Sequence, residues 1–374
     1  MSHLTYPEAG VVGLIQGITE LFPISSLGHN VLIPQIVGGS WAQDLNVSAP
    51  ESPYLAYVVG LHVATAAAMI IYFWRDWLRI IGGFFSSIRH MAVRNTDEKM
   101  AWMIIFATIP VGIAGLALEH LFRVAFSKPV PTALFLTANG IILFVGDQLR
   151  KLRTESGQAR GRAVAPAMAG NQGATRSMQA VSAETPPGGF PGVQGSMRGD
   201  APGPGGPGMP GAYPAAAPDA AHEQRLSHRD EREQEIVEAK QADQRLSAMG
   251  YVQATIIGSM QIVALLPGIS RDGIVMVGGM FRGLTREDAA RFSFLLSAPV
   301  ILAAGFLKIP DLFGPLGKGI HGQMVVGSIL SFVGAYLALR FFMRYIKNSE
   351  RTLAPFAIYC VVAGIGSLIY LTIR

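Results

Sequence analysis

The residues best equipped for chemistry near the amino terminus lie in one short stretch, QGITELFPISSLGH, which begins at Gln16. Gln16 and Glu20 are four residues apart and therefore share one face of a helix. Two hydroxyls and an imidazole follow directly, from Ser25, Ser26 and His29. Glu20 can act as a base or bind a divalent cation. Ser26 is a candidate nucleophile, and His29 is a candidate base, leaving-group acid or alternative nucleophile.

A second stretch whose residues could take part in a reaction, PGISRDG, begins at Pro267. Gly268 and Ser270 lie in a flexible backbone whose N–H groups can bind an anion, and Arg271 adds a guanidinium that suits phosphate oxygens. The guanidinium would also neutralise charge as a bridging P–O bond breaks. Asp272 is a hypothetical partner that orients this guanidinium or adds a metal ligand.

Each stretch alone also has a purely structural interpretation. Ser25 and Ser26 can cap a helix while Glu20 lies at the water interface, and Arg271 can snorkel from a simple helix break. Ionisable side chains at membrane depth are expensive and usually face a polar cavity, so the two stretches together favour a site. His62 lies in the middle of an apolar segment, where a helix–helix hydrogen bond is favoured over a catalytic role.

The elements that position these residues belong to a membrane protein. Half of the 374 residues are hydrophobic, 15% are charged and the mean hydropathy is +0.36, which is too apolar for a soluble domain of this size. The net charge of +5 is typical of membrane-flanking loops and does not indicate a nucleic-acid partner. The single cysteine, Cys360, excludes an intramolecular disulfide and a cysteine zinc cluster. No cleavable signal peptide is expected, because the amino-terminal residues lack a basic region.

Six apolar segments are predicted to cross the bilayer, whose core needs roughly 20 residues of helix. They are residues 54–74, 100–121, 132–145, 292–309, 323–345 and 355–373. Residues 10–37 and 258–280 are also apolar, but Pro, Gly, Ser and charge interrupt both, which predicts broken, re-entrant helices. The two interruptions resemble each other. Paired broken helices in two halves of a chain predict an all-α fold of inverted-topology repeats, with its site where the breaks meet.

Four regions follow from this pattern. Residues 1–153 and 249–374 form the two membrane repeats. Residues 154–221, rich in Gly, Pro and Ala, are predicted to be disordered, and residues 222–248 to form a charged, solvated helix. Three basic clusters place their loops on the cytoplasmic side by the positive-inside rule. These clusters are residues 75–99, 150–153 and 344–351.

The two motifs resemble those of a known family. QGITELFPISSLGH is similar to the (Glu/Gln)-x-x-x-Glu and Ser-Ser-x-Gly-His signature of the bacterial undecaprenyl-diphosphate phosphatases, the bacitracin-resistance type, and PGISRDG resembles their Pro-Gly-x-Ser-Arg motif. HVATAAAMIIYFWRD and GLTREDAARFSFLLSAPVILAAG resemble the segments that follow these motifs. The likeness therefore covers nearly everything outside the central insert. Two positions depart from it: Asp272 stands where Ser is common, and Val275 where Thr is common.

The resemblance implies transmembrane helices and two re-entrant helix pairs in interleaved inverted repeats, in the inner membrane of a bacterium. It implies hydrolysis of a C55 polyprenyl diphosphate to the monophosphate that carries cell-wall precursors. The resemblance also implies a divalent cation, Mg²⁺ or Ca²⁺, that would bind at Glu20. It is compatible with a homodimer. The expected catalytic residues are Glu20, Ser26, His29 and Arg271. The expected substrate-binding residues are Gln16, Ser25, Gly268, Ser270 and Asp272.

A transporter is the main alternative function, because broken helices and an inverted repeat also suit movement of an isoprenyl phosphate without hydrolysis. The clustering of Glu20, Ser26, His29 and Arg271 favours the enzyme, since transport needs neither a base nor a nucleophile. A scaffold whose insert recruits partners would leave the polar breaks unexplained. An acid phosphatase of the lipid-phosphate type is disfavoured, because SSLGH and SR occur without that class's Lys-led motif and distant His.

Overall fold

The computed structural model describes residues 4–45, 53–126, 128–178, 237, 240–307, 314, 319–348 and 351–373. The chain divides into two compact units. One consists of Met1–Arg153 together with Glu238–Arg374 and is called the membrane unit below, and the other is Thr154–Val237. Every regular element in the described residues is a helix, which confirms the predicted all-α class.

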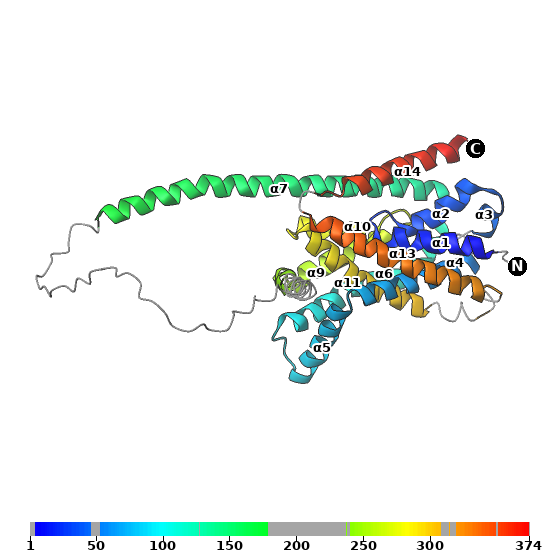
Figure 1. Ribbon diagram of the computed structural model, residues 1–374, viewed down its shortest axis with the longest axis horizontal. Coiled ribbons are helices and arrows are strands. Elements are labelled where there is room, and N and C mark those ends of the chain that lie inside the picture. Colours follow the sequence, from blue (N-terminus) through cyan, green and yellow to red (C-terminus); the bar gives the residue numbers. More distant parts are fainter. Residues whose placement is uncertain are drawn as a thin grey trace, which may run out of the picture. The chain divides into compact units, whose positions relative to one another are not determined.

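Helices follow one another along the chain (Figure 1). Their bounds are α1 Tyr6–Leu21, α2 Ser26–Val37, α3 Gly39–Asp44, α4 Pro53–Tyr72, α5 Trp74–His90, α6 Thr96–Phe126, α7 Pro129–Met178, α9 Tyr251–Ser259, η1 Met260–Leu265, α10 Arg271–Phe281, α11 Arg286–Leu307, α13 His321–Lys347 and α14 Ala354–Ile373. A further short helix, Lys240–Ser247, precedes α9.

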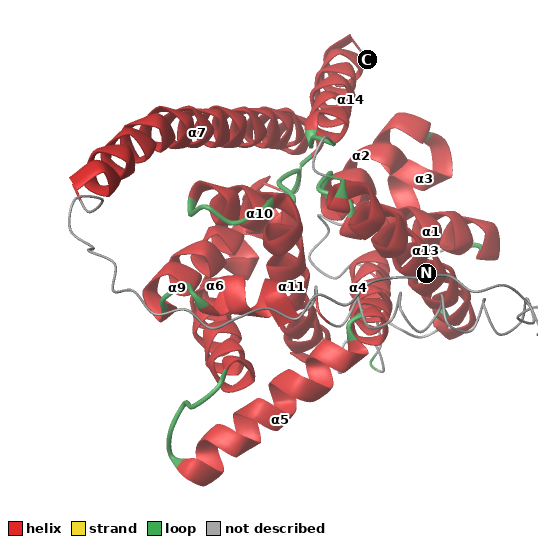
Figure 2. Cartoon of the chain, turned by 60° about the vertical axis from the view of Figure 1, so that its left-hand side comes forward, coloured by secondary structure: helices red, strands yellow, loops and turns green. Residues whose placement is uncertain are grey.

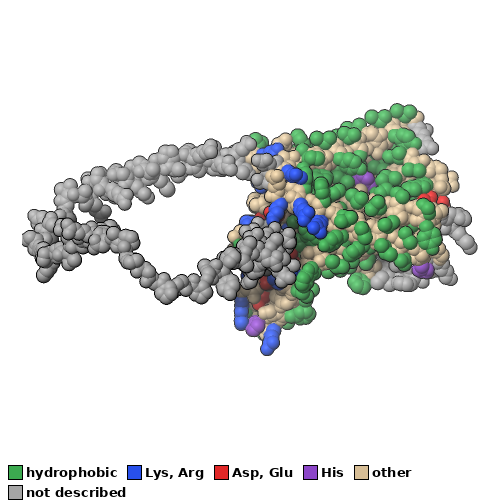
Figure 3. Space-filling model, viewed as in Figure 1, with side chains coloured by type: hydrophobic (Ala, Val, Ile, Leu, Met, Phe, Trp, Pro, Cys, Tyr) green, Lys and Arg blue, Asp and Glu red, His purple; other side chains and the backbone are tan. Residues whose placement is uncertain are grey.

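Membrane-spanning helices account for most of the membrane unit. In the described residues, α6, α7, α11, α13 and α14 are long and apolar enough to cross a bilayer, and two bent pairs raise that number to as many as seven. α4 supplies the remaining predicted span, and the chain turns by 85° between α4 and α5. Hydrophobic side chains cover most of the visible face of the membrane unit, while Lys and Arg gather toward one end (Figure 3). This is the distribution that lipid on the flank and a positive membrane surface favour.

Two helix pairs are interrupted at the predicted breaks, one between α1 and α2 and the other between η1 and α10. Each break ends in a serine that caps the following helix. Ser25 Oγ accepts a hydrogen bond from the Gly28 N–H, and Ser270 Oγ accepts one from the Gly273 N–H, both at 3.2 Å. These residues occupy matching positions in the two motifs, so the weak repeat in the sequence corresponds to a repeated local geometry.

The first helix of each re-entrant pair packs on a helix from the other half of the chain (Figure 2). α1 lies against α13, where a Cβ atom on Gly17 would be 2.2 Å from the Ser331 carbonyl oxygen. α9 lies against α6, where a Cβ atom on Gly258 would be 2.1 Å from the Ala107 carbonyl oxygen. Small residues permit such close backbone approach between helices in lipid. The two halves are therefore interleaved, in agreement with the predicted inverted repeats.

Gly17→Ala is expected to lower the stability of the membrane unit by about 1–3 kcal/mol, because the added methyl group must displace backbone atoms of α13. The measurement is the Tm of the full-length protein in detergent. Gly112→Ala and Gly115→Ala on α6 are matched controls, since their Cβ atoms would meet nothing within 4 Å. Both controls should keep or slightly raise the Tm, because Ala favours a helix over Gly. An unchanged Tm for Gly17→Ala would contradict the close α1–α13 contact.

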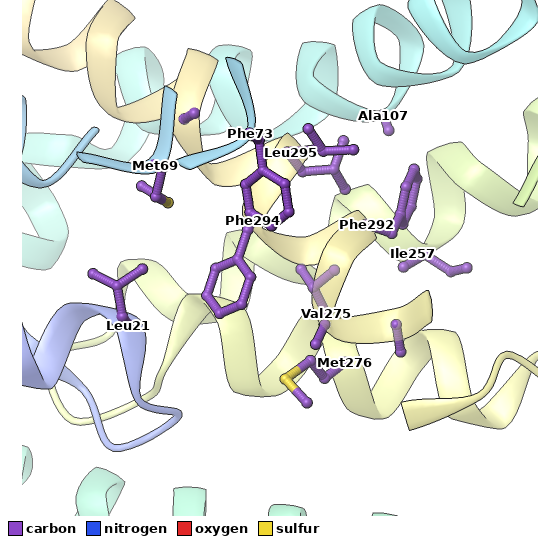
Figure 4. Close-up of a cluster of buried hydrophobic side chains, with 14 of the residues drawn as sticks. Leu21, Met69, Phe73, Ala107, Ile257, Val275, Met276, Phe292, Phe294 and Leu295 are labelled. Carbon is purple, nitrogen blue, oxygen red and sulfur yellow. The ribbon is translucent and has the colours of Figure 1, made fainter. Parts of the chain in front are cut away.

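Val275, one of the two departures from the family pattern, lies in the hydrophobic core (Figure 4). Its side chain is fully buried, in the same cluster as Phe292 and Phe294 of α11 and Phe73 at the α4–α5 turn. Burial of an apolar side chain at this position stabilises the contact between α10 and α11. The departure from Thr is therefore a change in the core.

The predicted disordered insert is only partly within the described residues. α7 continues as a helix to Met178, so residues 154–178 are helical where disorder was predicted. This part of the insert contains six Ala residues, which favour a helix, together with four Gly and Pro166, which do not. Residues 179–236 lie outside the described residues.

The described end of the predicted solvated helix, Lys240–Ser247, packs against the membrane unit. Asp243 is buried, and its carboxylate oxygens lie 2.8 Å from Arg79 Nη1 of α5 and 2.8 Å from Arg291 Nη1 of α11. A buried carboxylate needs such partners, because desolvation of an unpaired charge is costly. These ion pairs show that the described end of the predicted helix is packed and not solvated, while most of residues 222–239 lie outside the described residues.

Candidate active site

Polar side chains from four helices converge on the carboxylate of Glu20, near the end of α1. Gln16 Nε2 donates to Glu20 Oε2 at 3.0 Å, the Ser26 hydroxyl donates to the same oxygen, and His62 Nε2 lies 3.4 Å from it. Arg271 Nη2 lies 3.7 Å from the other oxygen, Oε1. Oε2 is therefore held by three protein groups, while Oε1 faces the guanidinium.

The contacts of Glu20 join the two re-entrant pairs. Glu20 and Ser26 belong to the first pair, and Arg271 begins α10 of the second. The Glu20 side chain is only 6% exposed, so its charge depends on these donors. The Arg271 side chain is 25% exposed, and its Nη1 is buried without a hydrogen-bond partner in the part of the chain that the structure describes. A guanidinium with an unused donor beside a fixed carboxylate is arranged to receive an anion such as a phosphate.

The two breaks are fastened to each other by Ser25 and Asn139. Besides capping α2, Ser25 Oγ accepts a hydrogen bond from the Gly268 N–H at 3.2 Å. The Asn139 side chain, on α7, donates to the Pro23 carbonyl oxygen and accepts from the Ser270 N–H, both at 2.9 Å. Ser25, Gly268 and Ser270, three expected substrate-binding residues, thus hold the backbone of the site in place.

Asn139→Leu is expected to lower the stability by about 1–3 kcal/mol, because it removes the acceptor of the buried Ser270 N–H and leaves the Pro23 carbonyl oxygen only the long contact from the Cys360 thiol, 3.9 Å away. It should also reduce activity, since the two breaks would no longer be fixed relative to each other. Tm in detergent is the readout. Thr137→Val is a matched control on the same helix, because the Thr137 hydroxyl donates only to the Ala133 carbonyl of α7 itself. Equal Tm values for the two variants would contradict a fastening role for Asn139.

His29 contacts α14. Its Nδ1 lies 2.7 Å from the Ser25 carbonyl oxygen, which can only accept, so Nδ1 carries a proton. Its Nε2 lies 2.7 Å from the Tyr359 hydroxyl oxygen and accepts from that hydroxyl in the neutral imidazole. The two rings are stacked, with centroids 5.7 Å apart. The lone pair that a base would use is therefore occupied by Tyr359.

Asp272 faces α11. Its Oδ1 accepts hydrogen bonds from the Ser293 hydroxyl at 2.7 Å and from the Ser297 hydroxyl at 2.6 Å. No ion pair joins Asp272 to Arg271 in the part of the chain that the structure describes, and Glu20 is the carboxylate beside the guanidinium. The structure therefore does not support the hypothesis that Asp272 orients Arg271. Instead, hydrogen bonds from Ser293 and Ser297 stabilise the buried Asp272 side chain.

Three partners in and around the site, His62, Asn139 and Tyr359, were not predicted as site residues. His62 was predicted to make a helix–helix hydrogen bond, and its Nε2 does contact another helix, because it lies 3.4 Å from Glu20 Oε2 of α1. A signal was present for two of them, because an imidazole and an amide stand in the middle of predicted spans. Tyr359 carried no such signal, because tyrosine is common on the surface of membrane helices.

Fold and site together define the class of protein. It is an α-helical membrane protein in which two re-entrant helix pairs, from opposite halves of the chain, meet around a carboxylate, a hydroxyl and a guanidinium. The apolar spans make it a multi-pass protein.

Comparison with known proteins identifies the family. A model of the family described as "Bacitracin resistance protein BacA" matches residues 9–183 and 226–366. The chain is 51% identical over 373 residues to a protein of Mycolicibacterium paratuberculosis named undecaprenyl-diphosphatase, with 100% of this chain and 99% of the relative covered. A Frankia casuarinae protein named undecaprenyl-diphosphatase 1 is 47% identical, with 97% of each chain covered. A Burkholderia orbicola protein named undecaprenyl-diphosphatase 2 is 31% identical, over 96% of this chain and 94% of the relative.

The chain belongs to the BacA family, which confirms the resemblance inferred from the two motifs. With the apolar spans, this places it in the inner membrane of a bacterium.

Proposed function

We propose that this protein hydrolyses undecaprenyl diphosphate to the monophosphate and inorganic phosphate, which renews the lipid carrier of cell-wall synthesis. The observation that carries the proposal is the hydrogen bond between the Ser26 hydroxyl and the Glu20 carboxylate, with the Arg271 guanidinium beside them. A nucleophile bonded to a base, next to a cation, is the arrangement that phosphoryl transfer needs. The names of the full-length relatives support the same substrate.

In this proposal Ser26 is the nucleophile. Glu20 takes the hydroxyl proton as the Ser26 oxygen bonds to the terminal phosphorus, and the bond from that phosphorus to the bridging oxygen breaks. The electron pair remains on the bridging oxygen, which becomes part of the lipid monophosphate, and Arg271 neutralises the developing charge. Water then attacks the phosphorus of the phosphorylated serine, the bond from that phosphorus to the Ser26 oxygen breaks, and Glu20 returns the proton to the Ser26 oxygen as inorganic phosphate leaves.

Ser26 is preferred to His29 as the nucleophile because of their different partners. The Ser26 hydroxyl is hydrogen-bonded to a carboxylate that can accept its proton, whereas the His29 lone pair is directed at Tyr359. In the proposal His29 instead supports the break, through its hydrogen bond to the Ser25 carbonyl.

A divalent cation, Mg²⁺ or Ca²⁺, belongs to the proposal as an ion that arrives with the substrate. No group of three His, Cys, Asp or Glu side chains that could hold a metal occurs among the described residues. Glu20 Oε1 can supply one oxygen, and diphosphate oxygens and water suit the remaining positions of such an ion. When bound, the ion would neutralise charge on the diphosphate.

The test is phosphate release from undecaprenyl diphosphate by the purified full-length protein in detergent, with and without Mg²⁺ or Ca²⁺. A substrate radiolabelled in the terminal phosphate should, after rapid acid quenching, leave label on the peptide that contains Ser26. Ser26→Ala should abolish both this label and phosphate release. Release without any labelled protein would replace Ser26 by an activated water, and lipid binding without release under every metal condition would favour a transporter.

A further inference from the structure

His62 is the contact of Glu20 that comes from outside the two re-entrant pairs. Gln16 lies on the same helix as Glu20, Ser26 begins α2 and Arg271 begins α10, whereas His62 lies in the middle of α4. Gln16 therefore moves with Glu20 whenever α1 moves. Among the described residues, His62 is the side chain that ties the carboxylate to α4, and this side chain is 18% exposed.

The ring of His62 is held in one orientation. Nδ1 lies 2.8 Å from the Val58 carbonyl oxygen of the preceding turn, and because a carbonyl only accepts, Nδ1 must donate. Nε2 is thereby directed at Glu20 Oε2, 3.4 Å away. At this distance an Nε2–H group can donate to the carboxylate oxygen, and a charged acceptor strengthens such a contact.

The two carboxylate oxygens of Glu20 therefore have different partners. Gln16, Ser26 and His62 approach Oε2, and only Arg271 approaches Oε1. A carboxylate that pivoted about its terminal bond would lose the Ser26 hydroxyl, and a displacement of about 1 Å can cost about 100-fold in rate.

We propose that His62 is a positioning residue, which holds Glu20 Oε2 on the Ser26 hydroxyl and leaves Oε1 directed toward Arg271. This inference rests on the proposed hydrolysis and adds to it a residue that acts through Glu20. The competing interpretation is that His62 only stabilises helix packing. Positioning changes kcat at constant stability, whereas packing changes the Tm.

Two substitutions separate the two contacts of the ring. In His62→Gln the amide nitrogen occupies about the place of Nε2, so the donor to Glu20 is kept. In His62→Asn the shorter amide occupies about the place of Nδ1, so only the bond to Val58 is kept. His62→Met has the length of Gln without its donor. His90→Asn, on the exposed end of α5, is the matched control for the histidine-to-asparagine change.

The experiment measures kcat and KM for phosphate release from undecaprenyl diphosphate, together with Tm, for the full-length protein in detergent. His62→Asn and His62→Met are expected to lower kcat by about 10-fold to 100-fold with KM and Tm close to wild type. His62→Gln and His90→Asn should stay near wild type.

Two results would overturn the positioning role while leaving the hydrolysis intact: wild-type kcat in both His62→Asn and His62→Met, or a loss in all three His62 variants that follows their Tm. A wild-type protein that releases no phosphate would instead overturn the proposed hydrolysis, and the role of His62 with it.

Discussion

Glu20→Gln is expected to lower kcat for phosphate release by about 10³-fold, because an amide cannot accept the proton of the Ser26 hydroxyl. The amide also presents an N–H₂ group to side chains that are themselves donors, from Gln16, Ser26 and Arg271. The measurement is phosphate release at saturating undecaprenyl diphosphate by the full-length protein in detergent. A parallel Tm shows whether the variant is folded.

Glu8→Gln provides a matched control on the same helix. Glu8 Oε2 accepts from the Thr5 N–H at 2.8 Å and forms a capping box at the start of α1, remote from the breaks. This control should lower the Tm by a few degrees at most and leave kcat unchanged. If Glu20→Gln retained wild-type kcat while folded, Glu20 could not be the base, and the hydrogen bond from Ser26 would be structural.

The fold could be predicted from the sequence to a large extent, because lipid imposes strong rules on composition. An apolar run of sufficient length favours a helix that satisfies its own backbone, and a run in which Pro, Gly, Ser and charge fall close together favours a break. Both helix breaks follow from that rule. The interleaving of the two halves follows from the similarity of the two interrupted segments, which predicts an inverted repeat. The 85° turn into α5 does not follow, because it depends on the packing of α5 against α6.

The meeting of Glu20 with Arg271 was predictable for a different reason. Residues close in sequence, such as Glu20 and Ser26, are brought together by one helix break. Arg271 is far away in the chain and reaches them only because matching breaks of an inverted repeat meet. The two motifs therefore supply both residues of the central contact of the site, Glu20 and Arg271.

Partners that cross between ordinary helices could not be predicted. The contacts of His62 with Glu20 and of Asn139 with both breaks depend on how α4 and α7 rotate against the re-entrant pairs, and no local pattern records that rotation. The prediction for Asp272 failed in the opposite way. Asp272 and Arg271 are neighbours in the sequence, which suggested a contact that the described structure does not show. Consecutive residues at the start of a helix project about 100° apart, so Asp272 faces α11 while Arg271 faces Glu20.

Arg271→Ala is expected to lower kcat/KM by about 10³-fold or more, because it removes both a phosphate-binding cation and the charge that stabilises the breaking P–O bond. Arg271→Lys should recover part of this loss, since an ammonium supplies the charge without the planar fork. Arg282→Ala, on an exposed residue just after α10, is the matched control and should retain wild-type kcat/KM.

The Arg271 variants also separate binding from chemistry. Nη1 is buried without a partner and Nη2 lies beside Glu20, so the guanidinium has one donor for the substrate and one for the carboxylate that acts on Ser26. Loss of the first raises KM, and loss of the second lowers kcat, so Arg271→Ala should change both constants. Measured rates over a range of lipid concentrations test this. A rise in KM with kcat unchanged would restrict Arg271 to substrate binding and leave Glu20 and Ser26 to carry the reaction without it.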